Sequence, residues 1–185
     1  IRRALHPYGP VVIATKGGLT RTGPNRWHSL GRPEYLRQCV ELSLRRLGME
    51  QIPLYQLHRV DSAVPLADQI GELAALQSEG KIAHLGLSEV DVPTLQAAQA
   101  ITPIVSVQNR YNIFSTGSAP VLEFCEQHNI ALIEDDTYSP LADSNTPLKA
   151  IKAWDRTGNV IYCASLSKTV APGLRLGWMT AGRWQ

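Results

Sequence analysis

Short runs of consecutive apolar residues recur along the chain, and each run is followed by a stretch with helical periodicity. The runs are continuous rather than alternating, which is typical of strands that are covered on both faces. The predicted strands are Val11–Lys16, Pro53–His58, Ala83–Ser88, Ile104–Asn109, Ile130–Asp135 and Val160–Ser165. Strands that alternate with helices predict βαβ units. The expected fold class is therefore α/β, with a parallel β-sheet of about six βα units.

Helix signals fill the intervals between the predicted strands. One helix is expected from Pro33 to Gly48, because proline favours the first turn and glycine favours the position after the last. Its buried face is predicted from residues spaced three or four apart, namely Leu36, Val40, Leu44 and Leu47. Further helices are expected at 66–78, 92–100 and 119–128.

Polar residues stand at the C-terminal ends of the first four predicted strands. They are Lys16, His58, Ser88 and the pair Gln108 and Asn109. In a parallel α/β sheet this edge is where ligands bind and where chemistry takes place. Turns also favour polar residues, so ordinary loop composition is the alternative interpretation. The repetition at four matching positions favours a binding or catalytic site.

Composition narrows the classes of function. Hydrophobic residues make up 44% and charged residues 18% of the chain, as in folded globular proteins. A net charge of +2 predicts no nucleic-acid partner, and the chain shows neither a signal peptide nor an apolar run of membrane-spanning length. Cys39, Cys125 and Cys163 lie in apolar contexts, which favours free thiols in a reducing compartment, here the cytoplasm. The histidines lack metal-ligand spacing, so no metal site is expected.

Four strand-end motifs together resemble one known family. "VVIATKGG", "LYQLHRVD", "KIAHLGLSEV" and "PIVSVQNRYN" follow one another in the order and spacing of the aldo-keto reductases. The resemblance covers about residues 1–130. It implies part of a (β/α)8 barrel and an oxidoreductase that transfers a hydride from NADPH to a carbonyl group.

The resemblance also implies roles for the strand-end residues. Lys16 matches the catalytic lysine that lowers the pKa of the family's acid tyrosine, and His58 matches the histidine that polarises or orients the carbonyl. Ser88 and Gln108 match residues that hold the nicotinamide carboxamide, and Asn109 beside them is expected to bind the cofactor as well. The family's catalytic aspartate and tyrosine precede this lysine, and its barrel-closing strands follow position 130. Neither is found in the 185 residues, so the family's reaction is not expected to run.

The C-terminal third carries a second resemblance. "LIEDDTYSPL" and "NVIYCASLSKTVAPGLRLGWMTAGRW" are similar to fold-type I pyridoxal-phosphate enzymes, both aminotransferases and the aminotransferase-like domains of bacterial regulators. An acidic loop and a solvated lysine are the alternative interpretations of these segments taken singly. The implied cofactor contacts are Asp135 to the pyridine nitrogen, Tyr138 to the phenolic oxygen, Lys168 as the Schiff-base lysine, and Ser165, Ser167 and Arg175 to the phosphate.

The two resemblances together predict a chimera, artificial or recombinant, of two enzyme fragments. The expected parts are a partial barrel at 1–132 and an aminotransferase-like fragment at 133–185, with the junction inside 121–142. A sheet that stops before barrel closure leaves open strand edges, which predicts self-association.

Three functions remain open at this point. The favoured one is a folded chimera with no complete active site and no native activity. The others are residual pyridoxal-phosphate binding through Lys168 and an NADPH-binding reductase-like fragment. No cofactor is expected at full occupancy in any of the three.

Overall fold

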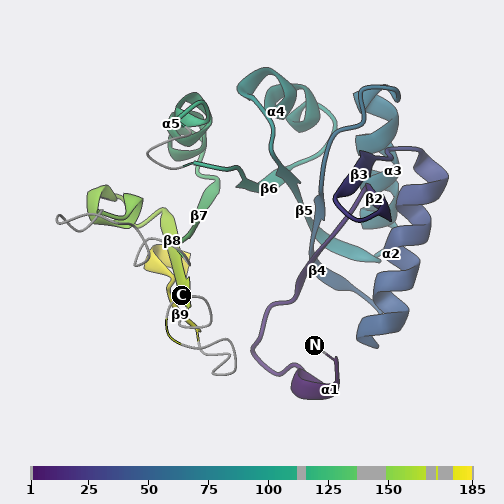
Figure 1. The fold of residues 1–185 in the computed structure, drawn as a ribbon, viewed down its shortest axis with the longest axis horizontal. Helices are drawn as coiled ribbons and strands as arrows, with labels where there is room; N and C mark the ends of the chain where they lie inside the picture. The colour runs from purple at the N-terminus through teal and green to yellow at the C-terminus, as the bar shows by residue number, and fades with distance from the viewer. Residues whose placement is uncertain (1, 112–115, 137–148, 166–169, 171–176, 185) are drawn as a thin grey trace. The chain divides into compact units, whose positions relative to one another are not determined.

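The computed structural model describes residues 2–111, 116–136, 149–165, 170 and 177–184 (Figure 1). The chain divides into two compact units, residues 1–121 and residues 122–185. Each unit contains parallel strands accompanied by helical segments, so the predicted α/β class with a mostly parallel sheet is confirmed.

The first unit is built on strands that are all parallel to their neighbours. In spatial order they are β1 (Ala14–Gly17), β4 (Ile52–Leu57), β5 (Ile82–Ser88) and β6 (Ile104–Gln108). The predicted start of the first strand at Val11 is wrong. Val11 and Val12 are 46% and 71% exposed and lie before the ladder that begins with Ala14 opposite Leu54.

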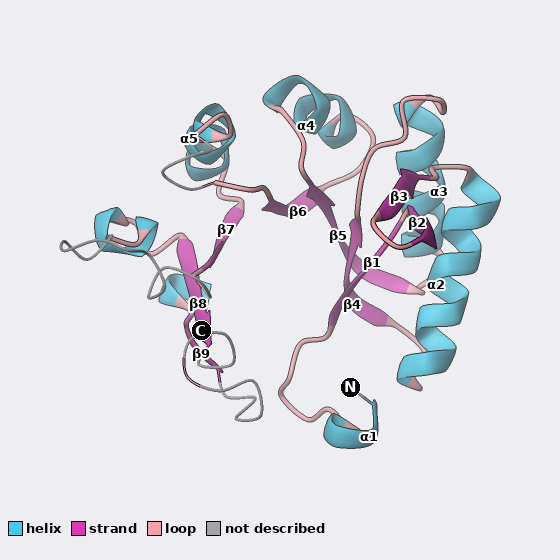
Figure 2. Ribbon diagram, viewed as in Figure 1, coloured by secondary structure: helices cyan, strands magenta, loops and turns pink. Residues whose placement is uncertain are grey.

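Three helices of the first unit, α2 (Pro33–Leu47), α3 (Leu66–Ser78) and α4 (Val92–Gln99), lie along one side of these strands (Figure 2). The short helix α1 (Arg2–Leu5) lies next to the N-terminus, and α5 (Ala119–Gln127) crosses the boundary between the units. Helix α2 ends as predicted, because Gly48 adopts the left-handed conformation at φ 68° and its N–H donates to the Leu44 carbonyl. Asp91 begins α4 by accepting a 2.9 Å hydrogen bond from the Thr94 N–H.

Most of the side chains buried between the helices and the strands are hydrophobic. The four residues predicted for the buried face of α2 are all buried, and they face a core that includes Tyr55, Leu57, Leu85 and Leu87. Burial of most side chains of β4 and β5, on both faces of each strand, explains why these two strands have apolar runs in the sequence.

A β-hairpin that the apolar pattern did not predict follows β1. Its strands are β2 (Leu19–Gly23) and β3 (Arg26–Ser29), and they pair antiparallel. The turn between them contains Asn25 at φ 56°, a left-handed conformation that asparagine tolerates better than most residues. Half of the hairpin's residues are exposed, so its strands lack the apolar runs that marked the others.

The second unit contains three strands in the order β7, β8, β9. Strands β7 (Ala131–Asp135) and β8 (Val160–Ser165) are parallel, as the sequence predicted, and their register places Asp135 opposite Cys163. Strand β9 (Gly177–Thr180), which was not predicted, pairs antiparallel with β8. Two short 3-10 helices, η2 (Ile151–Trp154) and η3 (Gly182–Trp184), complete the described part of this unit.

A buried aspartate organises the segment between η2 and β8. The side chain of Asp155 is 1% exposed and accepts hydrogen bonds from Lys152 Nζ at 2.8 Å and from the backbone N–H groups of Thr157, Asn159 and Val160 at 3.0–3.1 Å. Burial alone would raise the pKa of this carboxyl, but the bonds from Lys152 and the backbone outweigh it and hold the pKa well below 3.8.

Three expectations from the sequence concern membrane spans, metal sites and cysteines. None of the helices within the described ranges is long and apolar enough to cross a membrane. Within those ranges, no three His, Cys, Asp or Glu side chains gather closely enough to hold a metal ion. Cys39, Cys125 and Cys163 are free thiols, with Cys125 buried and the other two half-buried.

Candidate functional site

The C-terminal ends of β1, β4, β5 and β6 bring four of the predicted site residues to one edge of the first unit. Lys16 lies in β1, His58 directly follows β4, and Ser88 and Gln108 end β5 and β6 as directly opposed partners. The Lys16 ammonium donates a 2.7 Å hydrogen bond to Gln108 Oε1. Because β4 and β5 lie between β1 and β6, this bond passes over the ends of both intervening strands. We call these four residues the strand-end site.

The strand-end site lowers the basicity of its own lysine. Burial lowers the pKa of Lys16, and the nearby guanidinium of Arg59 lowers it further, while the carboxylate of Glu89 acts in the opposite direction. Lys16 therefore loses its proton more easily than a lysine in water does.

His58 is held at the edge by its backbone and is kept neutral by its surroundings. Its N–H donates to the Gly17 carbonyl at 2.8 Å, which continues the β1–β4 ladder by one residue. Burial lowers the pKa of the imidazole below 6.5, and the positive charges of Lys16 and Arg59 lower it further. At neutral pH the imidazole is thus uncharged, and one ring nitrogen carries a proton that it can donate to a carbonyl oxygen.

Arg59 belongs to the site although the sequence interpretation did not select it. Its Nη1 donates to the His58 carbonyl at 2.6 Å and to Ser88 Oγ at 3.2 Å. One signal could have identified it, since Arg59 directly follows His58 within the motif "LYQLHRVD".

Two glycines after Lys16 allow β1 to approach its neighbours closely. A Cβ on Gly17 would lie 1.9 Å from the hydroxyl of Tyr55, and one on Gly18 would lie 2.8 Å from a methyl carbon of Leu57. Gly18 also has φ 91°, a conformation that side-chain-bearing residues rarely adopt. The pair "GG" therefore follows from packing at the end of β1.

Asp61 supports the loop that carries His58 and Arg59. Its carboxylate accepts 2.9 Å hydrogen bonds from the N–H groups of Gly31 and Ala63, which lower its pKa. Its backbone N–H donates to the side chain of Gln69, which is fully buried. The last residue of "HRVD" thus has a structural role.

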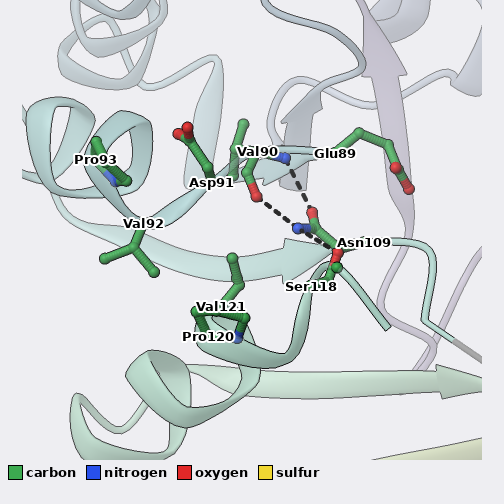
Figure 3. A pocket seen from close by; sticks show the side chains of 10 residues that line it. Glu89, Val90, Asp91, Val92, Pro93, Asn109, Ser118, Pro120 and Val121 are labelled. Carbon is green, nitrogen blue, oxygen red and sulfur yellow. Dashed lines mark hydrogen bonds between the residues drawn. The ribbon is translucent and has the colours of Figure 1, made fainter. Parts of the chain in front are cut away.

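Asn109 lies apart from the Lys16–Gln108 contact. Figure 3 shows its side chain directed at the backbone of Val90, which donates to Asn109 Oδ1 at 3.1 Å and accepts from Nδ2 at 2.6 Å. It lines a cavity of about 420 Å³ between the beginnings of α4 and α5, together with Glu89, Pro93 and Ser118. Its predicted contact with a cofactor stays a prediction.

In the second unit, the structure describes two of the six residues predicted to hold pyridoxal phosphate. Asp135 ends β7 and is exposed, and Ser165 ends the neighbouring parallel strand β8. The adjacent Asp136 accepts a 2.7 Å hydrogen bond from the Tyr162 hydroxyl, a contact that the sequence did not indicate. Tyr138, Ser167, Lys168 and Arg175 lie outside the described residues.

The hydrogen-bond donors of the strand-end site suit the carboxamide group of a nicotinamide ring. Gln108 has an N–H₂ group free of partners in the described part of the chain, and neutral His58 offers a donor beside it. These groups would hold a carboxamide and orient a carbonyl, whereas no residue described at this edge is placed to grip the rest of a dinucleotide.

Comparison with known proteins identifies the family. The Aldo/keto reductase family profile matches residues 1–149, and the chain belongs to this family. The chain is 54% identical over 133 residues to an uncharacterized oxidoreductase of Schizosaccharomyces pombe, covering 72% of this chain and 44% of that protein. It is 38% identical over 136 residues to a probable aldo-keto reductase of Glycine max, covering 73% and 38%. The chain thus spans less than half the length of these relatives.

Solved structures agree with the sequence relatives. A glycerol dehydrogenase of Gluconobacter oxydans superposes with a TM-score of 0.64 at 29% identity, over 74% of this chain and 45% of that one. An aldo-keto reductase of Bacillus halodurans in its holo form gives 0.61 at 26% identity, over 75% and 47%.

A second family profile matches the C-terminal part. Aminotransferase class I and II matches residues 119–184, which overlap the first profile from 119 to 149. The boundary between the two compact units, between Val121 and Leu122, lies near the start of this overlap.

Proposed function

We propose that the strand-end site is the carbonyl- and nicotinamide-facing half of an NADP(H)-dependent aldo/keto reductase active site. The observation that carries this proposal is the 2.7 Å contact between Lys16 and Gln108. It joins two residues 92 positions apart, which places a lysine of lowered pKa beside an amide at the ligand-binding edge of a parallel sheet.

Each residue of the site has a separate task in this proposal. His58 donates a hydrogen bond to the substrate carbonyl oxygen, and Lys16 places positive charge where that oxygen becomes negative. Gln108 and Ser88 hold the nicotinamide ring in position. When bound, NADPH supplies the hydride that reduces the carbonyl carbon.

We further propose that the 185-residue chain is a chimera whose second part derives from an aminotransferase. Two family profiles that meet between 119 and 149 support this, as do two compact units that meet at 121 and 122. The proposed domains are 1–132 and 133–185, and we propose that these 185 residues by themselves are catalytically inactive.

Residual binding of pyridoxal phosphate is a second candidate. Asp135 and Ser165 end two neighbouring parallel strands of the segment that matches the aminotransferase profile. Borohydride trapping followed by peptide mapping tests this candidate, with Asp135→Ala as the control. Selective labelling of Lys168 that decreases in the control supports it, whereas even labelling of the lysines contradicts it.

Titration with NADPH tests the main proposal. We expect weak, saturable binding, with a dissociation constant of roughly 0.1–1 mM because only part of the dinucleotide is contacted. Gln108→Leu should abolish the binding. Gln51→Leu is the matched control, because the Gln51 side chain bonds the Gly80 carbonyl away from the site. Equal binding by both variants would contradict the proposal.

A further inference from the structure

The acceptor oxygens of both predicted carboxamide-binding residues each accept a hydrogen bond from a cation, which leaves one lone pair on each oxygen. Gln108 Oε1 accepts from Lys16 at 2.7 Å, and Ser88 Oγ accepts from Arg59 at 3.2 Å. An ammonium group and a guanidinium group can only donate, so these bonds determine which atoms of Gln108 and Ser88 remain for a ligand.

Most of the hydrogen-bonding groups that remain are donors. Gln108 keeps both hydrogens of its Nε2, and Lys16 keeps two ammonium hydrogens, with no other partner for either in the described residues. Arg59 likewise keeps its Nε and Nη2 hydrogens, since both of its hydrogen bonds within the described residues use Nη1. Ser88 is only 3% exposed and lies beneath Arg59, so Gln108 is the more accessible of the two polar residues.

The charge around these donors is predominantly positive. The charges of Lys16 and Arg59 both lower the pKa of His58, and the charge of Arg59 lowers the pKa of Lys16. Both shifts are in the direction expected where positive charges lie close together. Glu89 is the acidic group that opposes them at Lys16, and one of its oxygens already accepts a 2.6 Å hydrogen bond from the Arg110 N–H.

We infer that the strand-end site binds its ligand through an acceptor oxygen at Gln108, and that it prefers a carboxylate to a carboxamide there. A carboxylate accepts from Gln108 Nε2 and from Lys16 without breaking the bond between them, and its charge offsets theirs. A carboxamide brings no charge to offset those of Lys16 and Arg59, and its N–H₂ group finds there only the second lone pair of Gln108 Oε1, next to the ammonium group. This inference rests on the proposed function, because it concerns the same site.

Three pyridines that differ only in the 3-substituent test the preference. Pyridine-3-carboxylate, 3-acetylpyridine and pyridine-3-carboxamide are titrated into the ¹⁵N-labelled 185-residue chain while the side-chain amide signals are recorded. The Gln108 pair is identified by its loss in Gln108→Leu, and the Gln51 pair is the internal control. We expect half-saturation by the carboxylate at a concentration about tenfold below that of the carboxamide, with the acetyl compound between them.

Substitution of Lys16 tests the cause. Lys16→Met frees Gln108 Oε1 and removes the ammonium, so the preference should fall to within about twofold, while Lys16→Arg should keep it. If Lys16→Met loses its dispersed spectrum, the order of the three ligands on the unaltered chain decides. A carboxamide that binds as tightly as the carboxylate overturns this inference and leaves the proposed function standing. Failure of all three pyridines and of NADPH to shift the Gln108 signals overturns the proposed function, and this inference with it.

Discussion

The hydroxyl of Tyr55 occupies the space where a side chain on Gly17 would begin. A Cβ on Gly17 would lie 1.9 Å from that oxygen, and the hydroxyl is buried without a hydrogen-bond partner in the part of the chain that the structure describes. The same burial raises the pKa of Tyr55. Gly17, next to Lys16, is thus packed directly against a buried side chain of the first unit, with no room for a Cβ.

This contact predicts opposite effects for two substitutions. Tyr55→Phe should leave the free energy of unfolding unchanged or raise it by about 1 kcal/mol, because it removes an unsatisfied buried hydroxyl. Gly17→Ala should lower it by about 1–3 kcal/mol through overpacking. The double variant should lose less than Gly17→Ala alone, although the Cβ of Cys39, 2.9 Å from the added carbon, still crowds it. Urea denaturation of the four proteins measures the coupling, and simple additivity would show that the two residues do not clash.

The positive charge of Arg59 predicts a change in the titration of His58. Arg59→Met removes one of the charges that lower the His58 pKa, so the pKa should rise toward 6.5 and more of the imidazole should be protonated at pH 7. NMR titration of the His58 Cε1–H signal measures the shift. Arg45→Met, on α2, is the control and should leave the midpoint in place. A lower midpoint in Arg59→Met would contradict the electrostatic account.

Asp155 predicts a pH-dependent stability of the second unit. Asp155→Asn should lower the free energy of unfolding by about 2–4 kcal/mol, because the partly buried Lys152 ammonium loses its charge partner and the backbone N–H groups lose a charged acceptor. The folded-state pKa lies below 3.8, so the stabilisation by the charged form is complete above about pH 5 and decreases as the pH falls through 3.8. Guanidinium denaturation followed by tryptophan fluorescence, at neutral and at acidic pH, measures the difference. If the difference in the free energy of unfolding between wild type and Asp155→Asn were as large in acid as at neutral pH, the charge of Asp155 would not be its cause.

Aldehyde reduction by the isolated 185-residue chain should be at least about a hundredfold slower than that of a full-length aldo/keto reductase. In the described residues the Lys16 ammonium contacts Gln108 rather than a tyrosine hydroxyl, so no lysine-activated tyrosine is present there to protonate the developing alkoxide. NADPH oxidation with an aldehyde is the assay. Saturable turnover that disappears in Lys16→Met and His58→Ala would show that the site is more complete than we propose.

Self-association is expected from the outer strands. β1 and β9 are the end strands of the described sheet order, and Val12, Trp178 and Met179 near or in them are 71%, 48% and 62% exposed. Unpaired strand edges with exposed apolar residues tend to pair with a second copy. Light scattering should therefore show a dimer or larger species at micromolar concentration. Val12→Lys combined with Trp178→Lys should shift the population toward monomer, and a dispersed wild-type monomer would contradict the expectation.

The buried part of the fold was predictable because it depends on local apolar pattern. Helix α3 begins at Leu66 and ends at Ser78 as expected, and β8 covers Val160–Ser165 as expected. The hairpin β2–β3 and strand β9 were missed, since the burial of their side chains follows no apolar run. These strands form because they pair with other strands, β2 with β3 and β9 with β8, and the residues within one strand do not indicate such a partner.

The sequence predicted which residues lie at the strand-end site but not how their side chains contact one another. The sequence located Lys16, His58, Ser88 and Gln108 at strand ends, because parallel strands present their ends at one edge. It could not show that Lys16 reaches across two strands to Gln108, or that Arg59 covers Ser88, because these contacts depend on side-chain directions set by the folded sheet.

The carboxylate of Glu134, in β7, accepts hydrogen bonds from the N–H groups of Ile151 at 2.6 Å and Lys152 at 2.9 Å. Folded residues therefore hold both ends of the stretch between Asp136 and Ala150 close together. These two hydrogen bonds fix the start of η2 against β7, and β7 and β8 pair directly with each other. A junction between segments of different origin can therefore follow β7 without loss of the contacts that hold β7, η2 and β8 together.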